Sequence, residues 1–167
     1  MVIWIIGRSG SGKTFFAKNL KKLLKSYKTI HVDGDEVRRY FYNNKLGFSI
    51  KDREKNSLFI INLCKFLEKK SFVVICSVQS IFTNHQKLNR KKFNSYYQIF
   101  IDVNFDRLKK RNNKKIYSKK HNVVGRDIEF PTPYKSHYVF KNNFDNSYKE
   151  HLNTIYKLLK PKMKFLK

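Results

Sequence analysis

The stretch GRSGSGKT, residues 7–14, decides how this chain folds. It follows the apolar run 2–6, which is rich in β-branched residues, and it leads into residues 15–24, whose apolar side chains recur at helical spacing. This order predicts a strand, a glycine-rich loop and a helix. A loop of this composition in this context is typical of a phosphate-binding loop.

The residue types in the loop explain how it would hold phosphate. Glycines tolerate positive φ, so the backbone can direct N–H groups at phosphate oxygens while the helix adds its positive end. Lys13 would reach the terminal phosphates, and the hydroxyl of Thr14 would coordinate Mg²⁺. We therefore predict that the chain binds ATP together with Mg²⁺. The loop residues expected to contact the nucleotide are Gly7, Ser9, Gly10, Ser11, Gly12, Lys13 and Thr14.

The composition is that of one packed domain with a strong positive charge. The 167 residues, 41% hydrophobic and 16% aromatic, suffice for a single core. We expect one domain over residues 1–160 and a frayed basic tail over 161–167. The formal charge of +25 comes mostly from lysines spread along the chain. This distribution favours a solvated surface, although a nucleic-acid-binding protein stays an alternative.

Two further features concern the location of the protein. No apolar run approaches the roughly 20 residues needed to cross a bilayer, and no basic segment or cleavage site flanks the first apolar run. We therefore expect neither a membrane span nor a signal peptide. Cys64 and Cys76 lack metal-ligand spacing and are expected to be buried, reduced thiols. Together these features favour a cytoplasmic protein.

Strands and helices alternate along the rest of the chain, which predicts an α/β fold with three layers and a mostly parallel five-stranded sheet. The polar, basic stretch 113–133 shows no regular pattern. Because long irregular segments in compact domains are usually functional, we predict a mobile lid there. After the first helix, strands are expected at 29–32, 72–76, 97–103 and 136–140, and helices from 35, from 49 or 52 to about 70, and at 84–93, 105–112 and 146–159.

Two carboxylates follow the predicted second strand. Asp33 and Asp35 stand at its carboxyl end, and in a parallel sheet that end opens into the same crevice as the phosphate loop. Arg38 comes one helical turn later and can face the same site. Asp35 could instead cap the following helix. The two roles are compatible.

A second group of candidates comes where the next helix begins. Arg53 and Asn56 stand three residues apart on one face of that helix, and Phe48 precedes them in a turn. A guanidinium suits an anionic group and a ring suits a base, so this trio would serve a nucleotide substrate. Taken alone, the three residues could equally be ordinary surface side chains.

Taken together, these motifs resemble the adenylylsulfate kinase family. That resemblance implies a phosphate-loop kinase fold and transfer of the γ-phosphoryl group of ATP to the ribose 3′-hydroxyl of adenylylsulfate. It extends over nearly the whole chain, to about residue 141. The segments that carry it are GRSGSGKT at 7–14, DGDEVR at 33–38, LGFSIKDREKN at 46–56, ICSVQSIF at 75–82, KKIY at 114–117, and Gly125-Arg126-Asp127 with Pro131 and Pro133.

The resemblance also implies roles for individual residues. Asp35 would be the base or orienting group for the attacking hydroxyl, Asp33 would help to hold the metal, and Lys13 completes the catalytic set. Arg111 would belong to the ATP side, and a homodimer is expected. The residues implied on the acceptor and lid side are Arg38, Phe48, Arg53, Asn56, Val78, Gln79, Ser80, Lys114, Val124 and Arg126.

The departures from the family pattern concern the acceptor. Residues 123–127 read VVGRD where the family has Phe-Thr-Gly-Ile-Asp, so the lid phenylalanine that would sandwich adenine against Phe48 is missing. Losing one face of such a stack removes about 1 kcal/mol of base binding. A branch of the family that phosphorylates cytidine diphosphoramidate in bacterial capsule clusters looks similar here, and we favour that acceptor, with adenylylsulfate as the alternative. Arg8 is an additional cation in the loop, either a phosphate contact or, as we favour, a surface residue.

Overall fold

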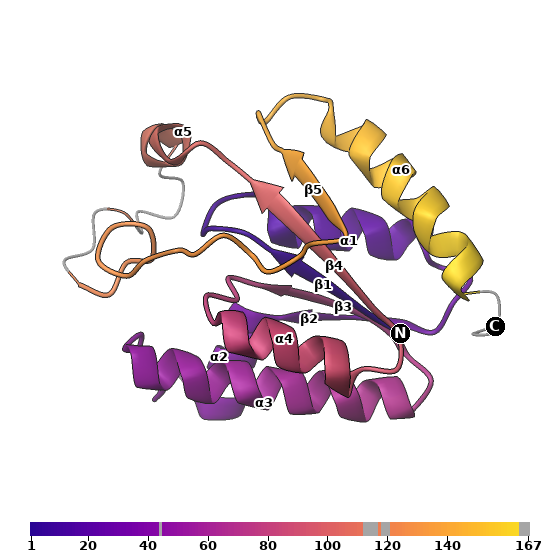
Figure 1. The fold of residues 1–167 in the computed structure, drawn as a ribbon, viewed down its shortest axis with the longest axis horizontal. Helices are drawn as coiled ribbons and strands as arrows, with labels where there is room; N and C mark the ends of the chain where they lie inside the picture. The colour runs from indigo at the N-terminus through magenta and orange to yellow at the C-terminus, as the bar shows by residue number, and fades with distance from the viewer. Residues whose placement is uncertain (44, 112–116, 118–120, 164–167) are drawn as a thin grey trace.

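The structure is a computed structural model and describes residues 1–43, 45–111, 117 and 121–163. A parallel sheet has helices on both faces (Figure 1). Its elements, in chain order, are β1 (Val2–Ile6), α1 (Lys13–Leu23), β2 (Thr29–Asp33), α2 (Gly34–Tyr42), α3 (Ile50–Lys69), β3 (Val73–Val78), α4 (Thr83–Lys92), β4 (Tyr96–Asp102), α5 (Phe105–Arg111), β5 (Tyr138–Lys141), α6 (Tyr148–Leu159) and a 3₁₀ helix (Lys160–Met163).

The sheet confirms the predicted fold class. Its five strands run in the order β2-β3-β1-β4-β5, and all four pairings are parallel. β1 lies at the centre, in register with β3 through Ile3–Ile75 and with β4 through Ile3–Tyr97. The carboxyl ends of β1, β2 and β3 therefore meet at one edge, where the phosphate loop begins.

Alternation along β1 builds the core on both faces of the sheet. Ile3 and Ile5 pack with α1 and α6 on one face, whereas Trp4 and Ile6 pack with α3 on the other. All of these side chains are at most 1% exposed. A strand that is apolar at every position fits a sheet covered on both sides, which explains the unbroken apolar run in the sequence.

The end of the chain differs from the prediction. Residues 161–163 were expected in a frayed tail, but they lie in the 3₁₀ helix that continues α6, and Met163 is fully buried in the α1–α6 core. The prediction is wrong for these residues because a single methionine among lysines gives no periodic signal. Residues 164–167 lie outside the described part of the chain.

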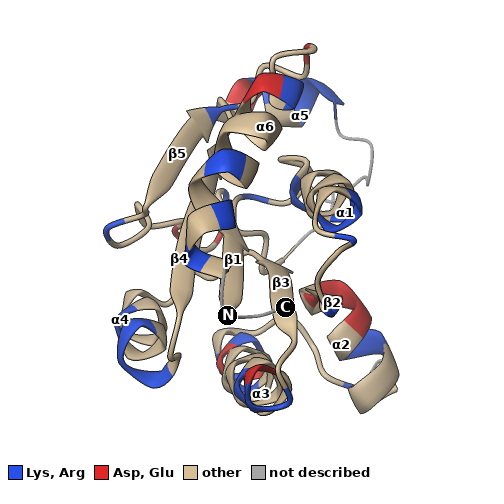
Figure 2. Cartoon of the chain, turned by 90° about the vertical axis from the view of Figure 1, so that its right-hand side faces the viewer, with Lys and Arg blue, Asp and Glu red and all other residues tan. Residues whose placement is uncertain are grey.

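Three whole-chain expectations can be compared with the structure. Lys and Arg lie on helices on both sides of the sheet, in keeping with a dispersed surface charge (Figure 2). Across the described ranges, no helix combines the length and apolar character that a membrane crossing requires. Cys64 and Cys76 are buried and unpaired by any disulfide, as expected.

Candidate active site

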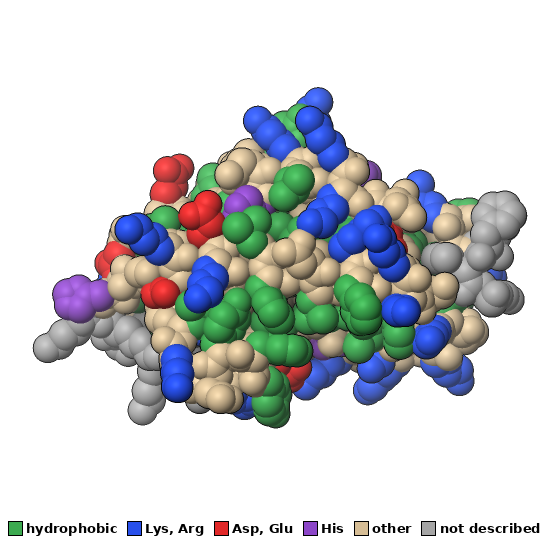
Figure 3. Space-filling model, turned by 90° about the horizontal axis from the view of Figure 1, so that it is seen from below, with side chains coloured by type: hydrophobic (Ala, Val, Ile, Leu, Met, Phe, Trp, Pro, Cys, Tyr) green, Lys and Arg blue, Asp and Glu red, His purple; other side chains and the backbone are tan. Residues whose placement is uncertain are grey.

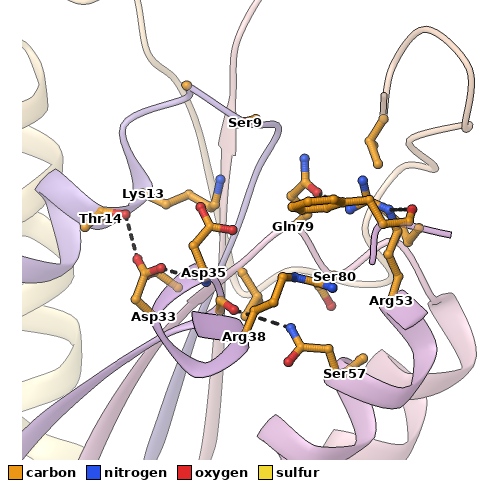
Figure 4. A pocket seen from close by; sticks show the side chains of 18 of the residues that line it. Ser9, Lys13, Thr14, Asp33, Asp35, Arg38, Arg53, Ser57, Gln79 and Ser80 are labelled. Atoms are coloured by element: carbon orange, nitrogen blue, oxygen red, sulfur yellow. Dashed lines mark hydrogen bonds between the residues drawn. The ribbon is translucent and has the colours of Figure 1, made fainter. Parts of the chain in front are cut away.

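A cavity of about 800 Å³ opens at the carboxyl edge of the sheet (Figure 4). Its walls come from the phosphate loop, the start of α2, the first turns of α3 and the end of β3. Residues 121–124 close one further side. These segments are the ones that the sequence singled out, so the structure brings most of the predicted site residues together.

The phosphate loop has the conformation that its glycines allow. Gly10 and Gly12 have φ of 79° and 93°, in the left-handed region that other residues rarely adopt. At Gly7 a side chain would meet the hydroxyl of Ser11 at 2.5 Å, so the space requires a glycine. α1 begins at Lys13, which directs the positive end of the helix at the loop.

Lys13 and Asp35 extend toward one another across the cavity (Figure 4). Lys13 Nζ also donates to the carbonyl of Arg8 at 2.8 Å, which holds the ammonium group over the loop. Asp35 is in the first turn of α2, where the helix dipole stabilises a carboxylate. A cation for phosphate and a carboxylate for a hydroxyl therefore face the same space.

Asp33 caps α2, and the alternative that Asp35 caps this helix is wrong. Asp33 Oδ1 accepts from the backbone N–H of Asp35 at 2.9 Å. Its Oδ2 accepts from Thr14 Oγ1 at 2.7 Å and from Ser77 Oγ at 2.9 Å. Burial by itself would raise the pKa of Asp33, but these hydrogen bonds outweigh it and the pKa lies below its ordinary value. Asp33 is therefore ionised at neutral pH, and Asp35 lines the cavity without serving as the N-cap of α2.

The pair Thr14 and Asp33 fits Mg²⁺. Both supply oxygen atoms, which Mg²⁺ prefers, and they already lie within hydrogen-bond distance of each other. Across the described ranges no three or more His, Cys, Asp and Glu side chains group into a metal site. An ion that takes most of its ligands from phosphate oxygens and water needs no such group.

Two arginines and an aromatic ring form the opposite wall. Arg38, only 8% exposed, donates to the carbonyls of Leu46, at 3.3 Å, and Gly47, and its Cζ lies 4.6 Å from the centre of the Phe48 ring. The Cζ of Arg53 lies 5.5 Å from the same ring. Burial lowers the pKa of both arginines, and for Arg53 the nearby charge of Arg38 lowers it further. A concentrated positive charge therefore faces the cavity beside the ring.

Hydrogen bonds hold Arg53 in place. Its Nη1 donates to Gln79 Oε1 at 2.8 Å, its Nε to the carbonyl of Phe48 at 2.9 Å and its Nη2 to the carbonyl of Asn122 at 2.8 Å. Arg53 thus connects α3 to the end of β3 and to the segment expected to form the lid. Gln79, which the resemblance implies on the acceptor side, lines the cavity.

Asn56 and the end of β3 form the base of the cavity. Asn56 Nδ2 donates to the carbonyl of Gly34 at 3.3 Å, and its Oδ1 has no hydrogen-bond partner within the described residues. Ser80 adopts φ of 53° and accepts from Trp4 Nε1 at 3.2 Å. Val78 and Ser80 both line the cavity, as predicted.

The lid residues meet the prediction unevenly. Val124 is buried and lines the cavity, but Arg126 is not among the described residues that line it. Arg126 pairs with Asp127 at 2.7 Å and donates to the carbonyl of Tyr117 at 3.1 Å, so its guanidinium is engaged by its sequence neighbour and by the backbone of residue 117. Lys114 lies outside the described residues.

Arg8 is neither a plain surface residue nor a cavity-lining cation among the described residues. Its Cζ lies 4.7 Å from the ring centre of Phe130 and 5.9 Å from that of Phe105. Its Nη1 lies 3.5 Å from the carbonyl of Val103 and 3.9 Å from Asp102. The expectation of a surface residue is therefore wrong, because aromatic rings from distant segments cover the guanidinium.

A second cavity of about 630 Å³ adjoins the phosphate loop on the side of α6, and most of its residues were missed by the sequence analysis. The guanidinium of Arg111, a predicted ATP contact, lies 3.9 Å from the ring centre of Phe144. Asn142 Nδ2 donates to the carbonyl of Ser11 at 3.0 Å, which ties this cavity to the loop. The polar run KNNFDN at 141–146, directly after a strand, was the available signal.

Comparison with known proteins agrees with this geometry. The family profile described as adenylylsulphate kinase matches residues 1–140. The chain belongs to the adenylylsulphate kinase family. Within this family, the chain is 35% identical over 168 residues to the cytidine diphosphoramidate kinase of Campylobacter jejuni, with 95% of each protein covered. It is 33% identical to a probable adenylyl-sulfate kinase of Archaeoglobus fulgidus, over 79% of this chain and 89% of the relative.

A solved structure of a family member has the same fold as this chain. The adenylylsulphate kinase of Mycobacterium tuberculosis, in complex with AMPPNP and APS, superimposes with a TM-score of 0.85 at 25% identity and covers 95% of this chain and 96% of that one. The adenylylsulphate kinase family member described here therefore has the phosphate-loop kinase fold, and its relatives transfer phosphate to hydroxyl acceptors.

Proposed function

We propose that this chain is an ATP-dependent kinase that phosphorylates the ribose 3′-hydroxyl of a small nucleotide, with cytidine diphosphoramidate as the favoured acceptor. The observation that carries the proposal is the single cavity in which Lys13 and Asp35 face each other while Arg38, Arg53 and Phe48 form the opposite wall. One side suits a transferable phosphoryl group and the other suits an anionic nucleotide.

The donor site uses the phosphate loop and the second cavity. The loop amides and Lys13 bind the phosphates of ATP, and the base of ATP occupies the cavity between Arg111, Phe144 and Asn142. Thr14 and Asp33 hold Mg²⁺, which supplies neutralisation of the phosphate charge when it is bound. Side chains of this protein position the substrates and accept the proton of the attacking hydroxyl.

The acceptor side explains how a hydroxyl would be presented. Arg38 and Arg53 grip the anionic group next to the ribose, and Phe48, which lines the cavity beside them, stacks on the base. Asp35 then orients the hydroxyl and receives its proton as the bond from the hydroxyl oxygen to the γ-phosphorus of ATP forms, while the bond from that phosphorus to the β,γ-bridging oxygen breaks and ADP leaves. Asn56 Oδ1, buried at the base of the cavity, is an acceptor for a donor group of the substrate.

Cytidine diphosphoramidate is favoured over adenylylsulfate for two reasons. Val123 and Val124, which lie beside the cavity, offer no ring to complete a stack around a purine. The relative from Campylobacter jejuni, a cytidine diphosphoramidate kinase, aligns over 95% of both chains. A pyrimidine needs less stacking surface than a purine does.

An acceptor panel tests the proposal. ADP release is measured with cytidine diphosphoramidate, with adenylylsulfate and without an acceptor, for the wild type and for Lys13→Ala and Asp35→Ala. We expect a higher kcat/KM with cytidine diphosphoramidate and near-complete loss in both variants. A higher kcat/KM with adenylylsulfate would establish the alternative acceptor, and normal turnover by either variant would contradict the assigned roles.

Assembly and location complete the proposal. A homodimer is supported by exposed apolar side chains on α2 and α3, among them Phe41, Leu58 and Phe66. Hydrophobic side chains gather on the face of the molecule that Figure 3 shows. Light scattering coupled to size exclusion measures the oligomeric state directly.

Two buried thiols, Cys64 and Cys76, are in keeping with the reducing cytoplasm. The dispersed charge of +25 supports recruitment of small anions rather than a nucleic-acid site.

A further inference from the structure

Behind Asp33 lies a chain of hydrogen bonds that the proposed reaction does not use. Asp33 and Ser77 are register partners on the adjacent strands β2 and β3. Ser77, 2% exposed, donates to Asp33 Oδ2 at 2.9 Å. Its Oγ also lies 2.8 Å from Nε2 of His31. His31 precedes Asp33 by two residues, so both side chains leave the same face of β2.

The chemistry of the groups gives this chain a direction. A serine hydroxyl has one hydrogen, and an ionised carboxylate can only accept. Because Ser77 donates its hydrogen to Asp33, the hydrogen in the 2.8 Å contact with His31 must be on Nε2. His31 therefore donates to Ser77, and Ser77 donates to the carboxylate.

The two oxygens of Asp33 have different duties. Oδ1 caps α2 through the N–H of Asp35, while Oδ2 is shared by Thr14 and Ser77. A hydroxyl binds a metal ion through an oxygen lone pair and keeps its hydrogen, so Thr14 would coordinate the ion and still donate to Oδ2. Ser77, on the neighbouring strand, is the second donor to Oδ2 and fixes the orientation of this oxygen whether or not the ion is bound.

The residues next to His31 and Ser77 on this face of the sheet are apolar, so core packing does not explain why polar side chains occupy these two positions. Ile75, the register partner of His31, and Ile5, the register partner of Ser77 on β1, are fully buried apolar side chains of the same face. Apolar residues at positions 31 and 77 would extend this core, whereas buried polar groups cost free energy unless they are paired.

We infer that Ser77 and His31 are positioning residues that hold the carboxylate of Asp33 for the metal ion of the kinase reaction. The inference rests on the proposed function, since it takes Thr14 and Asp33 as metal ligands. Neither residue touches a reacting atom; they act through Asp33. Partners of this kind orient a ligand before the metal arrives, which improves metal affinity.

Binding of Mn²⁺ in the presence of ATP tests the inference without relying on turnover. Free Mn²⁺ is measured by electron paramagnetic resonance for the wild type, Ser77→Ala, His31→Leu and His31→Gln. We expect Ser77→Ala and His31→Leu to bind Mn²⁺ about tenfold more weakly than the wild type. His31→Gln keeps an N–H donor for Ser77 and should restore most of the affinity.

A matched control separates positioning from general disturbance of the strand. Thr29 lies on the same face of β2, but its hydroxyl donates to the carbonyls of Leu24 and Tyr27, both at 3.1 Å, and among the described residues it has no hydrogen bond to Asp33 or Ser77. Thr29→Val should therefore leave Mn²⁺ affinity unchanged. Thermal unfolding of every variant shows which of them are folded.

Nitrogen NMR of the wild-type imidazole gives a second measurement, which remains available if a variant does not fold. We expect His31 to carry its hydrogen on Nε2. Unchanged Mn²⁺ affinity in folded Ser77→Ala, or a hydrogen on Nδ1 in the wild type, would overturn the inference. A wild type that fails to bind Mn²⁺ with ATP would contradict the proposed function itself, so the two failures are distinguishable.

Discussion

At the scale of single residues, a substitution of Asp35 gives the most direct test of the proposed reaction. It lines the cavity in the first turn of α2 and faces Lys13. Asp35→Asn keeps the shape but removes the charge and the proton acceptor, so kcat should fall by about 10²-fold or more. ADP release in the presence of acceptor measures the loss.

The control for this prediction is a carboxylate outside the cavity. Asp106 on α5 has a side chain that is 78% exposed and is not among the described residues that line either cavity. Asp106→Asn should retain wild-type kcat. Equal activity of Asp35→Asn and Asp106→Asn would contradict the assignment of Asp35.

The sequence was informative about residues wherever local spacing carries the chemistry. Thr14 begins the helix that follows β1 and its loop, and Asp33 and Asp35 stand at the end of β2 and the start of α2. The topology of a parallel sheet brings such positions to one edge. Ser77 and Asn142 were missed because their roles depend on partners 44 and 131 residues away, Asp33 and Ser11. Contacts over such distances leave no periodic pattern in a single sequence.

At the scale of elements, the 3₁₀ helix after α6 is part of the core. Met163 is fully buried against residues of the α1–α6 side, so Met163→Ala should lower the free energy of unfolding by about 2–5 kcal/mol through lost burial and a residual cavity. Urea-induced unfolding followed by circular dichroism measures the change.

A neighbouring position provides the comparison. Leu158, 43% exposed, belongs to the same helical end of the chain. Leu158→Ala should change the free energy of unfolding by only about 0.5 kcal/mol, because most of its surface is already in water. If Met163→Ala proves as mild as Leu158→Ala, the end of the chain is not a core element.

Helices and strands with strong periodicity were predicted closely, and the irregular segments were not. The start of α3 follows from the N-cap residue Ser49. The bounds of β1 follow from its unbroken apolar run. The segment expected to form the lid depends instead on contacts between residues far apart in the sequence, such as the donation from Tyr117 to the carbonyl of Ser9 at 2.8 Å. Local propensity carries no information about such a contact.

At the scale of the whole molecule, stability should decline with acid in two steps. Burial lowers the pKa of His31, His85 and His137, so the unfolded chain takes up these protons first. The free energy of unfolding should therefore fall as the pH drops below about 6.5. The lowered pKa values of Asp33 and Glu68 place a second loss below about pH 4.5.

Urea unfolding at a series of pH values measures both steps. His85→Gln removes one buried histidine and should flatten the first step while leaving the second in place. A free energy of unfolding that stays constant from about pH 7.5 to about pH 5 would contradict the assigned burial of the imidazoles.

The net charge should affect the rate at which the protein and its anionic substrates associate more than the rate of phosphoryl transfer. With +25 charges, the chain attracts anionic substrates from a distance, and salt screens that attraction. Raising the ionic strength should therefore lower kcat/KM for ATP while kcat stays nearly constant. Steady-state kinetics at a series of salt concentrations measures this, with a neutral salt of a second type as the control for specific ion effects. A fall in kcat of equal size would contradict steering.

The central place of β1 has a consequence for how the molecule opens. Each of its five residues is at most 1% exposed, and both of its edges are paired, with β3 and with β4. Amides in such a strand exchange with deuterium only when the entire domain unfolds, whereas those around Gly125 exchange through local opening. The phosphate loop therefore follows the slowest-exchanging strand of the protein. As the denaturant concentration is raised, we expect this loop to keep its structure longer than the other segments of the site.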